Sequence, residues 1–91
     1  MEIDIEKVKQ LSMLVQKGGF VIAGHALSRM SERCIRVEDA VNAILNGNCF
    51  AQEQPDGDRP PRFHFASRDR SITVIVAADL PVCIVTVFFE T

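Results

Sequence analysis

The sequence predicts one α+β domain over residues 1–91, with N-terminal helices packed on a C-terminal twisted antiparallel sheet. Ninety-one residues suffice for one hydrophobic core but not for two. Apolar residues recur at helical spacing up to residue 45 and at strand spacing after Gly47. Hydrophobic residues make up 47% of the chain and charged residues 24%, which is typical of a globular domain and not of a disordered chain.

Helices are expected in the first half of the chain, because apolar side chains there recur three and four residues apart. Asp4 is suited to be the N-cap of the first helix, and Gly18-Gly19 to end it. Asn46-Gly47 ends the last helix in the same way. The expected elements are a helix over residues 4–17, a short strand over residues 20–23, and helices over residues 25–32 and 37–45.

Strands are expected after Gly47, where the period of the apolar residues changes to that of a pleated strand. A proline-rich turn from Pro55 to Pro61 follows the first strand, and a tight turn at Asp79-Leu80-Pro81 joins the last two. The expected elements are an edge strand over residues 49–54 and strands over residues 62–67, 72–78 and 82–89.

The last two expected strands are apolar throughout, which is typical of strands that are covered on both faces. The helices can cover one face of a sheet this small. We therefore expect a second copy of the chain to cover the other face. Light scattering that shows only a monomer at high concentration would reject this homodimer.

Composition excludes several classes of protein. No apolar run reaches the roughly 20 residues of a membrane span, and acidic residues stand near the N-terminus where a signal peptide is basic. We expect no membrane partner and a cytoplasmic location. Cys34, Cys49 and Cys83 lack the spacing of metal ligands and are expected to be small buried hydrophobic residues in a reducing compartment. No glycine-rich phosphate loop is present, so neither a metal nor a cofactor is predicted.

The distribution of charge is more informative than its sum. The formal net charge of −2 is unusual for a protein that depends on phosphate contacts. All arginines, however, lie between Arg29 and Arg70, so folding can gather them into one patch. The six phenylalanines occupy apolar contexts and are expected in the core, not as platforms for stacked bases.

The most informative segment places His25, Arg29 and Arg33 four residues apart, and therefore along one stripe of a helix. Neighbouring cations repel each other by a few tenths of a kcal/mol in an isolated helix. An anion or a buried carboxylate against the stripe would offset this repulsion. The alternative remains open that Arg29 or Arg33 only pairs with Glu32, Glu38, Asp39 or a carboxylate of a strand, and that His25 is a capping or packing residue.

A second group of residues belongs to the expected strands. Arg62 and His64 are two residues apart and share a strand face, with Arg68 and Arg70 following. If this face meets the helical stripe, a base and an acid could cleave RNA without a metal while arginines stabilise the phosphorane. The catalytic candidates are then His25, Arg29, Arg33 and His64, and the phosphate-binding candidates are Arg62 and Arg68. The alternative is that His64 faces solvent on an edge strand.

Several of these residues form a pattern, His25-Ala26-x-x-Arg29-Met30-x-x-Arg33-x-Ile35, then Glu38-Asp39-Ala40-Val41, Gly47 and Val85-Thr86-Val87-Phe88. The pattern resembles a bacterial family, domain of unknown function family 4258, over about residues 20–89, after an additional N-terminal helix. The resemblance implies the fold of RelE- and BrnT-like toxins, among whose relatives are many ribonucleases paired with an antitoxin. It also implies that His25, Arg29 and Arg33 are signature positions. Cys34 stands where the family usually has glycine.

Two functions follow from these observations. The first is a non-catalytic binding module or homodimer, which the acidic net charge and the lack of stacking aromatics favour. The second is a metal-independent RNA endonuclease, which the arginine cluster and the resemblance favour. We prefer the binding module, with RNA, an antitoxin-like protein or a second copy as the expected partner.

Overall fold

The computed structural model describes residues 3–55, 57–79 and 81–89. The α+β class is confirmed, and every predicted element is present with its ends moved by no more than one residue. No helix in the described residues is long and apolar enough to cross a membrane. The turn predicted at Asp79-Leu80-Pro81 includes Leu80, which lies outside the described residues, as does Asp56 of the proline-rich turn. The elements are α1 (Ile5–Gln16), β1 (Phe20–Ile22), α2 (Gly24–Glu32), α3 (Val37–Asn46), β2 (Asn48–Glu53), β3 (Arg62–Ala66), β4 (Ile72–Ala77) and β5 (Val82–Phe89).

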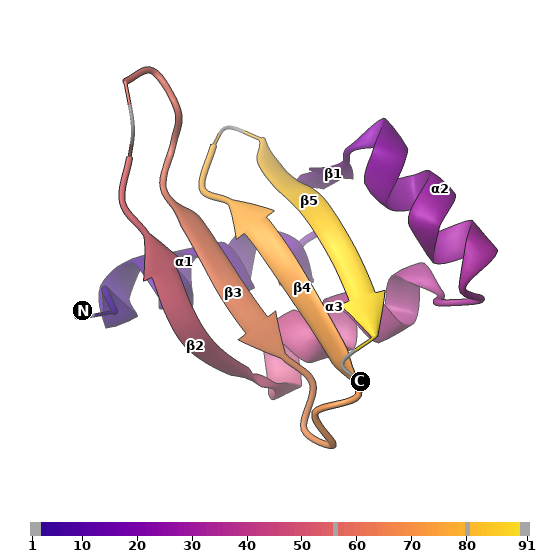
Figure 1. The fold of residues 1–91 in the computed structure, drawn as a ribbon. Helices are drawn as coiled ribbons and strands as arrows, with labels where there is room; N and C mark the ends of the chain where they lie inside the picture. Colours follow the sequence, from indigo (N-terminus) through magenta and orange to yellow (C-terminus); the bar gives the residue numbers. More distant parts are fainter. Residues whose placement is uncertain (1–2, 56, 80, 90–91) are drawn as a thin grey trace.

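The five strands form one sheet in the order β1-β5-β4-β3-β2 (Figure 1). Strands β2 to β5 form the predicted antiparallel meander. The short β1 pairs with β5 in parallel, so the sheet is mixed and not purely antiparallel. The three apolar residues of β1 do not encode whether the partner strand runs parallel or antiparallel to them. The direction of this pairing therefore depends on the path of the whole chain.

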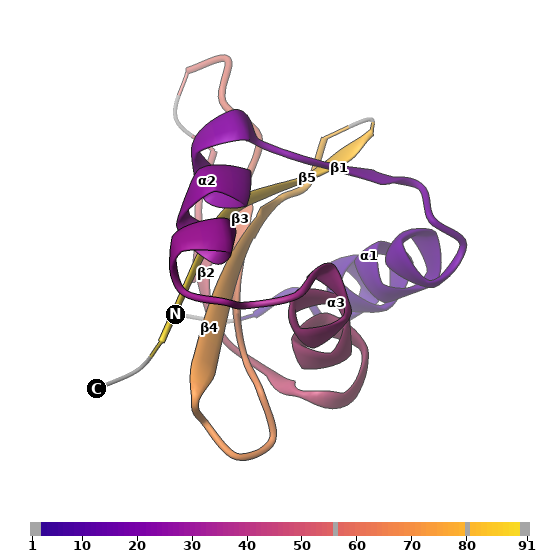
Figure 2. The same cartoon turned by 90° about the vertical axis from the view of Figure 1, so that its right-hand side faces the viewer.

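The core lies between one face of the sheet and the helices α1 and α3 (Figures 1 and 2). Alternation along β3 turns Phe63 and Phe65 into this core, where they are 0% and 1% exposed. The other side chains of the core come from α1, from α3, from around the end of α2 and from the inner strands: Leu11, Val15, Met30, Ile35, Ala40, Ala43, Ile44, Ile72, Val74, Val76, Val82, Ile84 and Val87.

The opposite face of the sheet has no helix packed across it in the described part of the chain (Figure 2). We call it the open face. By strand register it carries, among others, His64, Ala66, Thr73, Ile75 and Phe88. This is the face for which the sequence predicts a second copy of the chain, and that homodimer stays a prediction.

The N-terminus of α1 is tied to the far edge of the sheet. The Asp4 carboxylate accepts a hydrogen bond from the backbone N–H of Lys7 at 3.1 Å, which confirms the predicted N-cap. The backbone N–H of Asp4 donates to Oε1 of the buried Gln52 on β2 at 2.7 Å. The helix that precedes the family-like region is therefore an integral part of this fold.

Helix α2 stands apart from the other two helices, at the β5 edge of the sheet (Figures 1 and 2). Strand β1 pairs only with the first part of β5, from Val82 to Ile84. The chain then enters α2 at Gly24, and α2 packs beside β5. The second half of β5 thus has a helix, and not a strand, along this edge.

The end of α2 has the geometry of a Schellman motif. The N–H of Ile35 donates to the carbonyl oxygen of Met30 at 2.9 Å, and the N–H of Cys34 donates to that of Ser31 at 3.3 Å. Both Met30 and Ile35 are buried, which supplies the usual hydrophobic contact. Cys34 has a φ of 57°, so it adopts the left-handed conformation that the motif requires even though it is not glycine. The end of α2 is therefore as tight as in a chain with glycine there.

We expect Cys34→Gly to raise the free energy of unfolding by about 1 kcal/mol, because glycine adopts this conformation without the steric cost of a β-carbon. Urea denaturation measures the difference. Cys34→Ala is the matched control, since it keeps the β-carbon and removes a thiol that is exposed, and not buried as the sequence predicts. Equal stability of the glycine and alanine variants would contradict the prediction.

Candidate functional site

A groove of about 650 Å³ runs between α2 and the end of β5, and we call it the α2 groove. Its helical wall consists of His25, Arg29 and Arg33, which we call the α2 stripe. Its other wall is the end of β5, formed by Thr86, Val87, Phe88 and Phe89. The three residues that the spacing predicts to share a helix face therefore line one cavity.

Packing fixes the direction of the stripe. Ala26 and Met30, each one residue after a stripe residue, are buried at 0% and 2% exposure. Successive residues of a helix are about 100° apart, so His25 and Arg29 lie on the flank of this buried face, and both are exposed. The Schellman motif at Cys34 ends the helix directly after Arg33, the C-cap residue.

The α2 stripe is not neutralised by carboxylates of the described residues. The ion pairs among these residues join Arg36 to Asp39 at 3.9 Å and His64 to Glu53 at 2.6 Å. Asp39 also accepts a hydrogen bond from the backbone N–H of Arg36 at 3.0 Å and so caps α3. The described residues therefore do not support the structural alternative, in which neighbouring carboxylates form ion pairs with Arg29 and Arg33.

The expectation that the phenylalanines belong to the core is wrong for two of them. Phe63 and Phe65 are buried, but Phe50 is 48% and Phe89 is 45% exposed. Phe89 is the last residue of β5, and Phe50 lies where the register of β2 against β3 shifts. Each lines a cavity that also contains arginines. No periodicity of the sequence distinguishes them from the buried rings.

His64 does not line the α2 groove. It lies on the open face of β3, which is an inner strand and not an edge, and its Nε2 is 2.6 Å from Oε2 of Glu53. Its ring meets that of Phe50 edge-on, with centroids 5.9 Å apart. By register, Ile75 separates His64 from Thr86 of the groove, a distance of two strands or about 10 Å. The two histidines therefore do not share a cavity, and a catalytic role for His64 stays a prediction.

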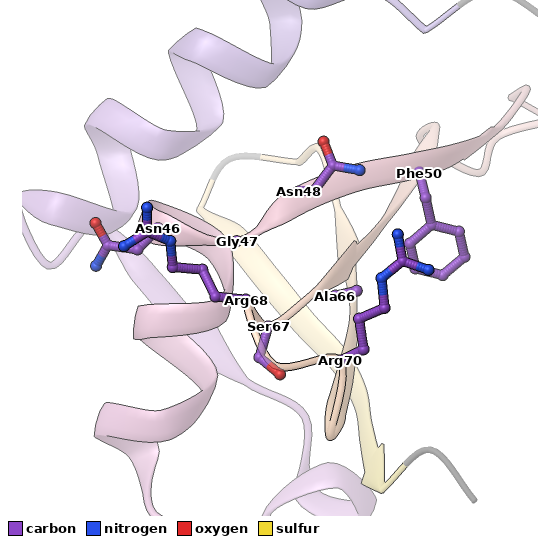
Figure 3. A pocket seen from close by; sticks show the side chains of 8 residues that line it. All are labelled: Asn46, Gly47, Asn48, Phe50, Ala66, Ser67, Arg68 and Arg70. Carbon is purple, nitrogen blue, oxygen red and sulfur yellow. The ribbon is translucent and has the colours of Figure 1, made fainter.

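The two predicted phosphate-binding arginines lie at opposite ends of β3. Arg62 begins the strand, half-buried and opposite Ala77. Arg68 follows the strand and lines a second cavity of about 610 Å³ together with Arg70 (Figure 3). Since β3 spans about 13 Å between Arg62 and Ala66, the structure does not bring Arg62 and Arg68 into one site.

The turn between β3 and β4 contains the most perturbed carboxyl of the described residues. Asp69 accepts hydrogen bonds from Oγ of Ser71 at 2.6 Å, from the backbone N–H of Ser71 at 3.0 Å and from Oγ of Ser67 at 2.8 Å. These bonds favour the carboxylate, those from Ser71 most strongly, and lower the pKa of Asp69 to about 2. The negative charge of Asp69 thus holds the turn together.

This pKa predicts a pH dependence of stability. A carboxyl whose pKa is lower in the folded state stabilises the fold above its unfolded pKa of about 3.9, and this contribution is lost as the pH falls towards 2. We expect Asp69→Asn to be less stable than the wild type at pH 6, and the difference to shrink as the pH approaches 2. Urea denaturation at both pH values measures it, with Asp58→Asn controlling for net charge. If the free energies of unfolding of the wild type and Asp69→Asn differ by the same amount at both pH values, the prediction is contradicted.

The fold and the α2 groove define a class of small α+β domain with an arginine-containing helix stripe beside a partly unpaired strand edge. Among the described residues, no group of three or more His, Cys, Asp or Glu side chains is placed to hold a metal ion. The chain belongs to the family described as Domain of unknown function (DUF4258), whose sequence model matches residues 22–89, about three quarters of the chain. Comparison with curated proteins and with solved structures finds no match.

Proposed function

We propose that this domain is a binding module for single-stranded RNA and that the α2 groove is its binding site. The observation that carries the proposal is the α2 stripe: three side chains that are cationic or can become so line one groove, and none forms an ion pair within the described residues. An anion in the groove would offset their mutual repulsion.

The chemistry of the groove fits a nucleotide strand. Guanidinium groups bind phosphate oxygens in a bidentate geometry, as Arg29 and Arg33 can do from one wall. Phe89, 45% exposed on the other wall, offers a ring on which an unpaired base can stack. Bases are available for stacking only in single-stranded segments, which favours these over duplex RNA.

RNA cleavage is the second candidate, favoured by the presence of His25 in the same groove as two guanidinium groups. In that case His25 would take the proton of the 2′-hydroxyl, and Arg29 and Arg33 would stabilise the phosphorane. We rank cleavage second because the groove contains one imidazole, while the reaction needs a base and an acid. A toxin-like ribonuclease of this kind would act on RNA in the cytoplasm, and an antitoxin-like protein would bind and inhibit it.

The test uses a fluorescently labelled oligouridine of about ten nucleotides, a length within the usual range of single-strand binders. We expect the fluorescence anisotropy to rise with protein at about 50 mM salt and the affinity to fall steeply towards about 200 mM salt. A matched duplex should bind more weakly. The absence of binding at low salt would overturn the proposal. Cleavage products on a gel that disappear with His25→Ala would support the second candidate.

A further inference from the structure

Another cavity lies at the turn between β3 and β4, and we call it the hairpin pocket (Figure 3). It measures about 610 Å³ and lies at the ends of several elements. The residues that matter here are Asn48 and Phe50 of β2, Ala66 of β3, and Arg68 and Arg70 of the turn. The α2 groove contains none of them.

The turn holds the two arginines of the hairpin pocket in place. The N–H of Ser67 donates to the carbonyl oxygen of Ile72, and the N–H of Arg70 donates to that of Ser67, both at 2.9 Å. The carboxylate of Asp69 accepts three hydrogen bonds from Ser67 and Ser71. All three bonds are to Oδ1 of Asp69, and neither arginine forms an ion pair with a described residue. The turn thus presents two guanidinium groups and one carboxylate, and among the described residues neither guanidinium is paired.

An aromatic ring, that of Phe50, lies beside one of these guanidinium groups, that of Arg70 (Figure 3). The register shift between Cys49 and Ala51 interrupts the pairing of β2 at Phe50, and the ring is 48% exposed. Figure 3 shows the Arg70 side chain extending towards Phe50 and the Arg68 side chain extending towards Asn46. The exposed Asn48 adds an amide that can both donate and accept hydrogen bonds.

We propose that the hairpin pocket binds a short segment of single-stranded RNA, with a base against Phe50, its phosphate against Arg70 and a neighbouring phosphate against Arg68. Arginines next to an exposed aromatic ring are the combination that binds single strands without reading their sequence. This inference rests on the proposed function, because it assigns the pocket to the same strand that occupies the α2 groove.

The geometry of the sheet connects the two cavities. Ala66 of the hairpin pocket is opposite Thr73, and Thr73 is opposite Phe88 of the α2 groove. The three residues form a row across the open face, and its two ends are two strands or about 10 Å apart. A strand of about four nucleotides, the lower end of known site sizes, is sufficient to reach from one cavity to the other.

Residue-resolved NMR titration distinguishes this proposal from the proposed function. The probes are uridine monophosphate and an oligouridine of about ten nucleotides. We expect the oligomer to shift the amide signals of Ala66 and Ser67 in the hairpin pocket together with those of Thr86 and Phe88 in the α2 groove. Shifts in the groove alone would overturn the hairpin proposal and leave the proposed function intact. Shifts at the hairpin alone would overturn the proposed function, and no shifts would overturn both.

Variants test the assigned contacts. Arg68→Gln with Arg70→Gln is expected to weaken oligomer binding about tenfold and to abolish the shifts at Ala66 while those at Thr86 remain. Lys9→Gln with Lys17→Gln on α1, which removes the same charge, should leave the affinity within about twofold. Phe50→Leu should weaken binding by about fivefold or more if the base stacks there. Unchanged affinity in the arginine variant would overturn the proposal, as would equal affinities for the monophosphate and the oligomer.

Discussion

Replacing Gly47 by alanine is expected to lower the free energy of unfolding by about 3 kcal/mol or more, a large part of the roughly 5–15 kcal/mol that stabilises a typical domain. A β-carbon at this position would lie 2.1 Å from the carbonyl oxygen of Ala66 and 2.2 Å from that of Ala43. Both atoms belong to the backbone, so no side chain can rotate away to make room. The φ of Gly47 is −87°, and the requirement for glycine therefore comes from space and not from handedness.

Urea denaturation measures this effect, and Gly24→Ala is its control. A β-carbon at Gly24 would meet no atom within 4 Å, so that variant should stay within about 0.5 kcal/mol of the wild type. The m-value should not change, because the same surface is exposed on unfolding. A Gly47→Ala protein as stable as Gly24→Ala would show that α3 and the end of β3 do not pack this closely in solution.

Reversing two charges of the α2 stripe, by Arg29→Glu with Arg33→Glu, is expected to weaken the binding of single-stranded RNA about a hundredfold or more. Each arginine loses a charge-assisted hydrogen bond to phosphate, which contributes about 1.5–3 kcal/mol, and each glutamate adds repulsion. The slope of log affinity against log salt should fall by about 1.4, because two phosphate contacts are lost. Fluorescence anisotropy over a series of salt concentrations measures both quantities.

The control for this variant is Lys9→Glu with Lys17→Glu, which changes the net charge by the same amount on exposed positions of α1. We expect it to weaken binding by less than about fivefold, since screening limits the reach of a distant charge to about 10 Å at 0.1 M salt. Equal losses in the two double variants would show that only net charge matters and that the stripe is not a site. If Arg29→Ala instead costs several kcal/mol of stability, the stripe has a structural role.

The sequence predicted the elements of this fold closely, because each carries its own local signal. The N-cap of α1 is an aspartate, the core-facing residues of β3 alternate, and Gly47 stands where the helical period ends. The prediction of the α2 stripe was accurate for the same reason: residues four apart on a helix share a face wherever that helix packs. Whether the stripe lines a cavity, however, depends on the end of β5, which is more than fifty residues away in the chain.

Only the tertiary structure determined how the helices and strands are placed relative to one another. The parallel pairing of β1 leaves half of the β5 edge to α2 and so creates the groove, and three apolar residues cannot encode that choice. Local sequence patterns likewise do not encode the exposure of the two phenylalanines, the separation of His64 from the groove, or the cavity at Arg68 and Arg70. Local patterns determine which face of an element is apolar. Which elements meet is determined by the packing of the whole chain, and a site formed between elements becomes visible only there.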